Sequence, residues 1–217
     1  MEIKTTENTG GTGPLARATR SLKQGLLIVV SGPSGVGKGT IVKELVRRQS
    51  ELLVSVSVTT RQPRPGEIDG HEYFFRDEDA FMRMVAGGEL LEYAQFVNGL
   101  YYGTPRALVE DAVARRQDVI LEIDVKGAIQ VKERWPDGVY IFLLPPSMEE
   151  LEARLIKRQT EAAEAIRQRL SVAVDELNFL PLYDYQVVND DLDAAVEKLQ
   201  CIIRAERCRV GRHLRHG

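Results

Sequence analysis

Apolar and polar positions follow two spacings along the chain, and these spacings predict strands and helices in turn. Residues 26–30 form an unbroken apolar run of strand length, as expected for a strand covered on both faces in a parallel sheet. From Ile41 onward the apolar residues recur three and four positions apart with charged residues between them, as on one face of a helix. The ordered part of the chain is therefore expected to begin with a strand, a glycine-rich turn and a helix.

Further apolar segments of strand length alternate with helical patterns, at residues 53–58, 119–123, 139–144 and 185–188. Strands that alternate with helices are typical of α/β proteins with a parallel sheet. A helix is expected after Ser147 and Glu150, which form a capping box, and a last helix after the acidic residues at 190–193. The pattern predicts a five-stranded parallel sheet flanked by helices.

Two stretches fall outside this pattern. Between the second and third strands lie residues rich in Gly, Pro, Tyr and Phe, with short strand-like pieces such as 72–75, which leaves room for a small inserted domain. Residues 5–21 are rich in Thr, Gly, Asn and Arg without apolar periodicity, so burial cannot offset their ordering entropy. We expect a disordered tail at 1–24, one domain at 25–208 and a short tail at 209–217.

The composition limits the partners that the chain can bind. With 29 Lys and Arg against 32 Asp and Glu, no overall positive field exists to hold a nucleic-acid backbone. No apolar run reaches the roughly 20 residues of a membrane helix, and the first 24 residues lack a signal-peptide core. Cys201 and Cys208 are separated by about two turns of a predicted helix, too far for a disulfide. We expect a cytoplasmic protein with reduced thiols and no nucleic-acid or membrane partner.

The turn after the first strand, Gly-Pro-Ser-Gly-Val-Gly-Lys at 32–38, has the spacing of a phosphate-binding loop between a strand and a helix. Its glycines let backbone N–H groups surround a triphosphate, and Lys38 reaches the outer phosphates. An ordinary glycine-rich turn would explain the glycines but not the lysine. The strict pattern has Ser or Thr after the lysine, whereas here Gly39 stands there and the hydroxyl follows on Thr40. The expected ATP-binding residues of the loop are Gly32, Pro33, Ser34, Gly35, Val36, Gly37, Lys38, Gly39 and Thr40.

A second basic motif follows the second strand, where Arg61 and Arg64 lie in a segment stiffened by Pro63 and Pro65. Planar guanidinium groups match the geometry of a phosphate dianion. A solvated basic turn would explain the same residues, and the segment alone does not decide between the two.

The loop at 32–38, the segment at 57–66 and Tyr-Tyr-Gly-Thr at 101–104 occur in the order found in the guanylate kinase family, which the chain closely resembles from about residue 25 to 207. The resemblance implies a P-loop NTPase-type α/β core, a GMP-binding α+β insert and a helical LID. It places the core at 25–57, 105–148 and 170–208, the insert at about 58–104 and the LID at about 149–169. ATP and GMP are the implied substrates, with Mg²⁺ accompanying ATP.

The resemblance also assigns the GMP site, with its phosphate held by Arg61, Arg64, Tyr73 and Tyr102 and its base surrounded by Ser57, Glu92 and Thr104. One carboxylate can accept the N1–H and N2–H₂ donors of guanine together, whereas adenine presents an unprotonated N1 to the same place. Glu92 is therefore the expected base selector. Without the resemblance, a solvent-facing glutamate would be the simpler interpretation.

The third strand ends in two acids, Glu122 and Asp124, as when a parallel sheet presents carboxylates to a magnesium nucleotide. The family more often has Asp where Glu122 stands, so the charge is kept on a longer side chain. Both acids are expected at the GMP site, and which of them contacts guanine or magnesium stays open; capping of the following turn is the alternative. Thr40 and Asp124 are the expected metal ligands, directly or through water.

Three arginines, Arg154, Arg158 and Arg169, lie on the stretch that resembles the LID. Arg154 is assigned to ATP binding by the resemblance, and Gln159 stands where the family usually has Gly. An Arg-rich and Glu-rich helix could also be a solvated face held by salt bridges. The expected catalytic residues are Lys38, Arg64, Arg158 and Arg169.

The expected reaction is reversible transfer of the γ-phosphoryl group of MgATP to GMP, or to dGMP as well, in purine nucleotide metabolism. Two alternatives stay open. One is a non-catalytic guanylate-kinase-like module that binds phosphopeptides, against which the intact loop at 32–38 argues. The other is a kinase for a sugar phosphate or another nucleotide, against which Glu92 and Thr104 argue. The chain is expected to be a monomer or a homo-oligomer.

Overall fold

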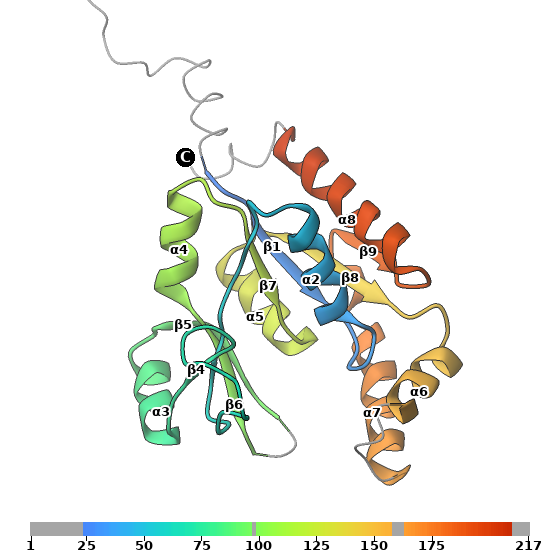
Figure 1. Ribbon diagram of the computed structural model, residues 1–217, viewed down its shortest axis with the longest axis horizontal. Coiled ribbons are helices and arrows are strands. Elements are labelled where there is room, and N and C mark those ends of the chain that lie inside the picture. The colour runs from blue at the N-terminus through green and yellow to red at the C-terminus, as the bar shows by residue number, and fades with distance from the viewer. Residues whose placement is uncertain (1–23, 97–98, 158–162, 210–217) are drawn as a thin grey trace, which may run out of the picture.

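Two β-sheets organise the chain in the computed structural model, which describes residues 24–96, 99–157 and 163–209 (Figure 1). The larger sheet has five parallel strands in the order β2-β7-β1-β8-β9, and the smaller has four in the order β4-β3-β6-β5. The predicted five-stranded parallel sheet is therefore confirmed. Arg158, Gln159 and nearly all of both expected tails lie outside the described residues.

The larger sheet is built around β1, which is buried along its whole length. Its alternate residues face two separate cores: Ile28 packs with α2 and α8, and Val29 packs with α4 and α5. An unbroken apolar run thus reflects burial on both faces. The strands are β1 (Leu27–Ser31), β2 (Leu53–Val54), β7 (Val119–Glu122), β8 (Val139–Leu144) and β9 (Tyr185–Val188). The covering helices are α2 (Lys38–Arg48), α4 (Arg106–Ala114), α5 (Val125–Arg134) and α8 (Leu192–Arg207).

The second predicted strand, at 53–58, is wrong in its second half. The chain follows β7 only as far as Ser55, whose N–H donates to the carbonyl of Ile120 (2.9 Å). It then leaves the larger sheet, and β3 (Val58–Thr59) pairs within the smaller one. The side chain of Val58 is buried with Phe81 in a core of its own. The apolar spacing continues across this change of sheet, so it could not reveal the break.

The smaller sheet carries one helix and lies among the residues expected to form the insert. Its other strands are β4 (Phe74–Phe75), β5 (Leu90–Gln95) and β6 (Tyr101–Pro105), and its helix is α3 (Glu78–Ala86). Strands β5 and β6 run antiparallel, and their register places Glu92 directly opposite Thr104. Directly opposed residues in a sheet bring their side chains together, so the pairing prepares a contact between these two.

Two further helices, α6 (Met148–Lys157) and α7 (Ala163–Leu177), lie beside each other and are followed by a short 3₁₀ helix, η1 (Leu180–Leu182). The predicted helix start is confirmed, since Ser147 Oγ accepts from the N–H of Glu150 (3.2 Å). Figure 1 shows the smaller sheet and the α6–α7 pair on either side of the end of β1 that leads into α2. None of the helices in the described ranges is long and apolar enough to cross a membrane.

Candidate active site

The loop between β1 and α2 ends in a helix start that no side chain caps. Gly37, the N-cap residue, has φ 99°, a left-handed conformation that glycine adopts without strain. The ammonium group of Lys38 donates to the carbonyls of Gly32 (2.6 Å) and Pro33 (3.1 Å), so it lies against the loop. Uncapped N–H groups at a helix start, together with an ammonium group, provide a binding site for phosphate.

Asn189, at the end of β9, supports this loop from behind, and sequence reasoning missed it. Its Nδ2 donates to the carbonyl of Val36 (2.7 Å) in a buried position. Arg154 adds two bonds, from Nη1 to the carbonyl of Val36 (3.4 Å) and from Nη2 to that of Asn189 (3.0 Å). The side chain of Arg154, which was predicted to bind ATP, therefore holds the loop by binding main-chain carbonyl groups. The signal for Asn189 was a polar residue directly after an apolar strand.

A second predicted arginine also reaches the loop. Nη1 of Arg169, on α7, lies 3.5 Å from Oγ of Ser34, at the outer limit of a hydrogen bond. The α6–α7 pair thus brings one predicted catalytic arginine to the mouth of the loop. Arg158, the other predicted LID catalyst, lies outside the described residues.

Gly39 and Glu122, the two residues near the loop that differ from the family pattern, lie close together in the structure. A Cβ on Gly39 would lie 3.2 Å from Oε1 of Glu122, which is tight for such a contact. The longer side chain of Glu122 thus extends toward the place that a Ser or Thr at 39 would fill. Desolvation of the carboxyl group raises the pKa of Glu122, and the ammonium group of Lys38 opposes this shift. Thr40 is exposed on the first turn of α2.

Asp124 caps helix α5, as the alternative interpretation expected. Its Oδ1 accepts from the N–H of Gly127 (2.7 Å). Its negative charge also raises the pKa of Glu92, so the two carboxyl groups are close enough to interact. Asp124 can therefore cap helix α5 and also lie near Glu92, the predicted base selector.

The predicted base-selecting residues form a buried pair. Oγ1 of Thr104 donates to Oε1 of Glu92 (2.7 Å), and these residues are 0% and 4% exposed. Burial raises the pKa of Glu92 to about 7; the Thr104 hydroxyl and Arg134 oppose the shift, and Asp124 adds to it. A buried carboxyl group with a neutral partner is energetically unfavourable when ionised. The alternative of a solvent-facing glutamate is thus wrong.

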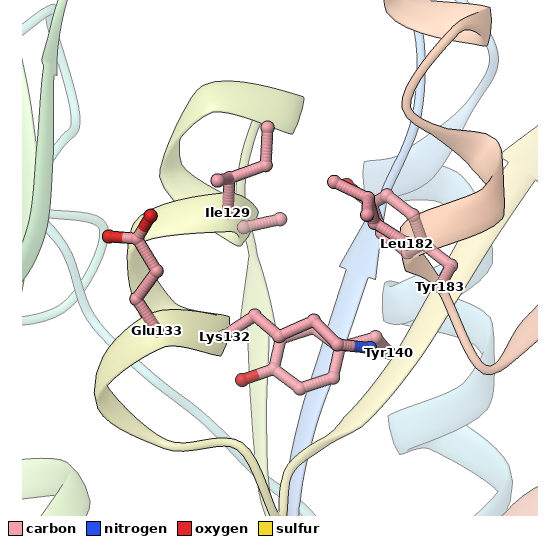
Figure 2. A pocket seen from close by; sticks show the side chains of 7 residues that line it. Ile129, Lys132, Glu133, Tyr140, Leu182 and Tyr183 are labelled. Carbon is pink, nitrogen blue, oxygen red and sulfur yellow. The ribbon is translucent and has the colours of Figure 1, made fainter.

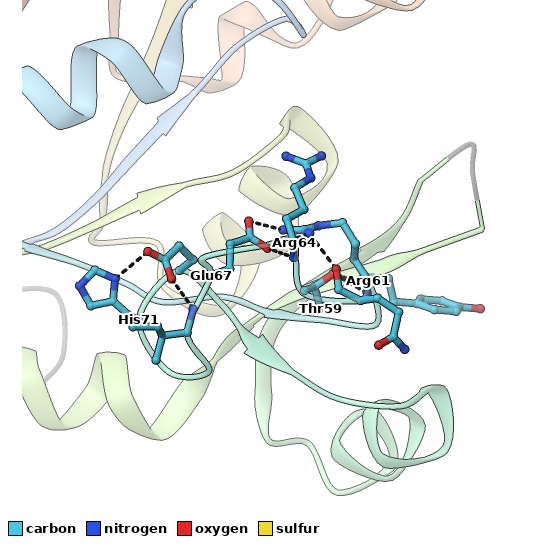
Figure 3. Close-up of polar contacts among 9 residues, drawn as sticks. Thr59, Arg61, Arg64, Glu67 and His71 are labelled. Atoms are coloured by element: carbon cyan, nitrogen blue, oxygen red, sulfur yellow. Dashed lines mark hydrogen bonds and ion pairs between the residues drawn. The ribbon is translucent and has the colours of Figure 1, made fainter. Parts of the chain in front are cut away.

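Two of the predicted phosphate-binding residues, Arg61 and Arg64, both contact the carboxylate of Glu67 (Figure 3). The two Nη atoms of Arg61 donate to the carboxylate of Glu67 (2.9 and 2.8 Å), and the Arg61 guanidinium lies 5.3 Å from the ring centroid of Tyr73. The rings of Tyr73 and Tyr102 meet edge to face at 5.9 Å. The same carboxylate accepts from the backbone N–H of Arg64 (2.7 Å). Only 14% of the Arg61 side chain is exposed, so the alternative of a solvated basic turn is excluded for this residue.

The charge of Glu122 also affects Tyr73, one of the predicted phosphate-binding residues. The pKa of Tyr73 is raised first by burial, then by Tyr102 and by the charge of Glu122. Tyr73 is therefore close enough to Glu122, at the end of β7, for the two groups to interact. The side chain of Ser57, by contrast, makes no hydrogen bond within the described part of the chain. Glu67 was missed by sequence reasoning, although its place three residues after Arg64, across Pro-Gly, signals a turn.

Comparison with known proteins identifies the family to which the chain belongs. The sequence matches the guanylate kinase family model over residues 24–206. The chain belongs to the guanylate kinase family. Members phosphorylate GMP with ATP, so the chain is a nucleoside-monophosphate kinase.

Named members of the guanylate kinase family are similar along most of their length. The guanylate kinase of Caldanaerobacter subterraneus subsp. tengcongensis is 54% identical over 191 residues, which cover 88% of this chain and 92% of that one. The guanylate kinase of Desulfitobacterium hafniense is 55% identical over 188 residues, which cover 87% and 94%. A crystal structure of guanylate kinase from Anaplasma phagocytophilum superposes with a TM-score of 0.71 at 34% identity, covering 89% of this chain and 92% of that one.

A separate cavity of about 270 Å³ lies between α5, β8 and the η1 segment (Figure 2). Its lining is mainly apolar and includes Ile129, Leu182 and Tyr183. Lys132 also lines it, but the ammonium group lies 4.6 Å from the ring centroid of Tyr140 and 3.5 Å from Oδ1 of Asp184. The cavity thus lacks the phosphate-binding groups that the guanylate kinase reaction needs.

Proposed function

We propose that this chain transfers the γ-phosphoryl group of MgATP to GMP at the carboxyl edge of the larger sheet. ATP binds on the loop at 32–40, and GMP binds on the smaller sheet. The observation that carries the assignment of GMP is the buried pair of Glu92 and Thr104, which supports a carboxyl group as the reader of the base on the smaller sheet. The reverse reaction, and transfer to dGMP, use the same base and phosphate contacts.

On the ATP side, the N–H groups of the loop and of the first turn of α2 bind the phosphates, and Lys38 neutralises their charge. Arg154 keeps the loop in place through its bonds to main-chain carbonyls. Arg169 approaches from α7, where its charge can stabilise the phosphoryl group in transfer. We assign the same role to Arg158.

The residues at this edge suit Mg²⁺ bound together with the nucleotide. The described residues contain no group of three or more His, Cys, Asp or Glu side chains that could hold a metal ion alone. Mg²⁺ prefers oxygen ligands and usually keeps several waters beside one or two carboxylates and substrate phosphates. Thr40 and Asp124 would hold the ion, directly or through water, with Glu122 beside them. When bound, the ion neutralises charge on the phosphates.

On the acceptor side, Arg61 and Arg64 bind the phosphate of GMP, with the hydroxyl groups of Tyr73 and Tyr102 around it. The acceptor oxygen is already anionic near neutral pH, so no general base is required. The barrier arises mainly from bringing two polyanions together in line. The interaction of Tyr73 with Glu122, at the end of β7, supports an acceptor phosphate on the side of the smaller sheet that is nearer the ATP loop.

The base is read by Glu92, which accepts from N1–H and N2–H₂ of guanine once it is ionised. Thr104 holds one of its oxygens, and Asp124 lies nearby as a second acceptor. We place Ser57 at the edge of the same base site. Adenine would present a lone pair to a carboxylate here, which disfavours AMP. We place the reaction in purine nucleotide metabolism in the cytoplasm, without nucleic-acid or membrane partners, with the chain as a monomer or a homo-oligomer.

The proposal is tested by ADP production from MgATP with GMP, AMP, UMP or CMP supplied separately. We expect fast turnover with GMP and at least about 100-fold lower kcat/KM with AMP, because a site built around donors rejects a base that lacks them. A Lys38→Ala variant should lose the activity while staying folded. Equal turnover of GMP and AMP, or activity independent of Lys38, would contradict the assignment.

A further inference from the structure

Helix α5 presents a glycine to the base selector. Gly127 is the third residue of α5, is buried and has ordinary helical backbone geometry. Its backbone conformation therefore does not require glycine, and glycine weakens a helix relative to alanine. A reason for glycine at this position must come from the space around it.

That space holds two carboxylates. A Cβ on Gly127 would lie 2.6 Å from Oε2 and 3.1 Å from Cδ of Glu92. It would also lie 3.2 Å from Oδ1 of Asp124, which caps the helix. Real Cβ atoms essentially never approach another heavy atom to 2.6 Å. The missing methyl group is thus what lets the carboxylate of Glu92 lie against the first turn of α5.

Other residues on α5 hold the strand that carries Glu92. Gln130 donates from Nε2 to the carbonyl of Tyr93 (2.8 Å) and accepts from its N–H (3.3 Å). Arg134 donates to the carbonyl of Leu91. Positions 127, 130 and 134 recur three and four residues apart, so they share one face of the helix. This face therefore contacts β5 at Glu92 and at the residues on both sides of it.

We propose that Gly127 determines guanine specificity by leaving the space in which Glu92 aligns its carboxylate with the base, while Gln130 and Arg134 position β5. The inference rests on the proposed function. The carboxylate must meet two adjacent donors of guanine together, and its place is fixed on one side by Thr104 and on the other by α5. Gly127 and Gln130 act through Glu92, so they are positioning residues.

A Gly127→Ala variant tests this with GMP and IMP as alternative acceptors. IMP lacks only the 2-amino group, so the ratio of the two kcat/KM values reports how well Glu92 is aligned. The added methyl group must displace Glu92, and a misplacement of about 1 Å can lower activity about 100-fold. We expect such a loss with GMP and a much smaller one with IMP, so the preference for GMP falls at least about tenfold. The KM for ATP should stay unchanged.

A double-mutant cycle separates this effect from a general disturbance. Glu92→Asp shortens the side chain by one methylene and makes room, so adding Gly127→Ala to it should lower the GMP preference little further. Glu133→Ala, at an exposed position on the same helix, is the control and should keep the preference of the unmodified chain. Urea denaturation and ADP binding show whether each variant is folded.

The outcomes are distinct. An unmodified chain that does not phosphorylate GMP would refute the proposed function itself. An active chain whose GMP preference survives Gly127→Ala would refute the role of Gly127. If Gly127→Ala does not fold, Gln130→Ala decides: it should lower the same preference without changing the KM for ATP, and an unchanged preference would overturn the inference.

Discussion

Glu92 combines deep burial with a neutral hydrogen-bond partner, so its charge depends on pH close to neutrality. Burial raises the pKa of this carboxyl group from 4.5 to about 7. A raised pKa means that the folded chain binds the proton more tightly than the unfolded chain. The protonated group therefore contributes stability that is fully present below pH 4.5 and is lost as the pH rises through about 7.

This pKa predicts how guanine binding changes with pH. The ionised carboxylate accepts both donors of guanine, whereas the protonated group cannot, so affinity should fall as the pH falls below about 7. Guanosine is the suitable ligand, because a phosphate group itself titrates near pH 6. Calorimetry between pH 5.5 and 8.5 should show the dissociation constant rising about tenfold per pH unit on the acid side.

Glu92→Gln provides the control for this measurement. Glutamine keeps the shape but does not titrate, so guanosine should bind it more weakly than the unmodified chain at pH 8 and without the same pH dependence. A dissociation constant of the unmodified chain that stays constant across the range would show that Glu92 is not the base selector.

For single residues, the sequence predicts a role only where the residue belongs to a recognisable motif. Lys38 could be predicted because the glycine spacing around it has a physical purpose. Glu92 and Thr104 were found only through the family resemblance, since nothing near Glu92 in the sequence signals a buried position. The role that we propose for Gly127 could not be predicted from the sequence, because it depends on a contact with β5, which is distant in the chain. These roles arise only once the sheet and the helix pack together.

The turn at 64–67 is the element that organises the phosphate-binding residues. Pro65 and Gly66 occupy its centre, and Gly66 has φ 89°, as a type II turn requires at its third position. The N–H of Glu67 donates to the carbonyl of Arg64 (3.0 Å), and the N–H of Arg64 donates to the Glu67 carboxylate (2.7 Å). Since the same carboxylate binds Arg61, one side chain links the two arginines.

Removing the charge of Glu67 should therefore weaken phosphate binding specifically. Charge-assisted hydrogen bonds contribute about 1.5–3 kcal/mol, and part of this is lost in Glu67→Gln because Arg61 is no longer held in a bidentate pair. We expect the dissociation constant of GMP to rise about tenfold, which is about 1.4 kcal/mol. Guanosine, which has no phosphate, should bind unchanged. Calorimetry with both ligands gives the comparison.

Asp69→Asn is the matched control, because it removes the exposed ion pair of Asp69 with Arg76 (3.2 Å) in the same segment. This variant should leave GMP binding nearly unchanged, as exposed ion pairs contribute little. Equal weakening of GMP and guanosine by Glu67→Gln would instead indicate that Glu67 only stabilises the fold of the smaller sheet.

Elements of the larger sheet could be predicted because burial on both faces leaves a long apolar run. Strands β3 and β4 have two residues each, which is too short to show a periodic pattern. Their pairing depends on the tertiary structure around them and not on their own sequence. The end of the strand at 53–58 could not be located for the same reason. Val58 is apolar because it belongs to another core, around Phe81.

Across the whole molecule, Asp118 joins the beginning and the end of the described chain. It is 5% exposed and precedes β7. Its Oδ1 accepts from the N–H of Leu26 (2.9 Å), before β1. Its Oδ2 accepts from Nε of Arg207 (2.8 Å), at the end of α8, and lies 2.6 Å from Nη2 of the same ion pair. Three segments far apart in sequence thus share one carboxylate, at the sheet edge opposite the proposed site.

Asp118→Asn should therefore lower stability without changing the chemistry. Asparagine keeps the size but loses the charge that Arg207 binds, and its amide can leave a buried donor unpaired. We expect the free energy of unfolding to fall by about 2 kcal/mol, within the range for buried hydrogen bonds to charged groups. Urea denaturation measures this change. Turnover per folded molecule with saturating ATP and GMP should stay the same, because Asp118 and the loop at 32–38 lie at opposite ends of the strands.

Asp111→Asn is the control for the expected loss of stability in Asp118→Asn. Asp111 pairs with Arg115 at 2.8 Å on the surface of α4, with 55% and 74% of the side chains exposed. Water screens such a pair, so its loss should change stability by about 0.5 kcal/mol or less. Both variants remove one carboxylate charge, so a larger effect at Asp118 measures the burial of its side chain together with its two hydrogen bonds and its ion pair. Equal effects would mean that the segments are held together by their apolar cores alone.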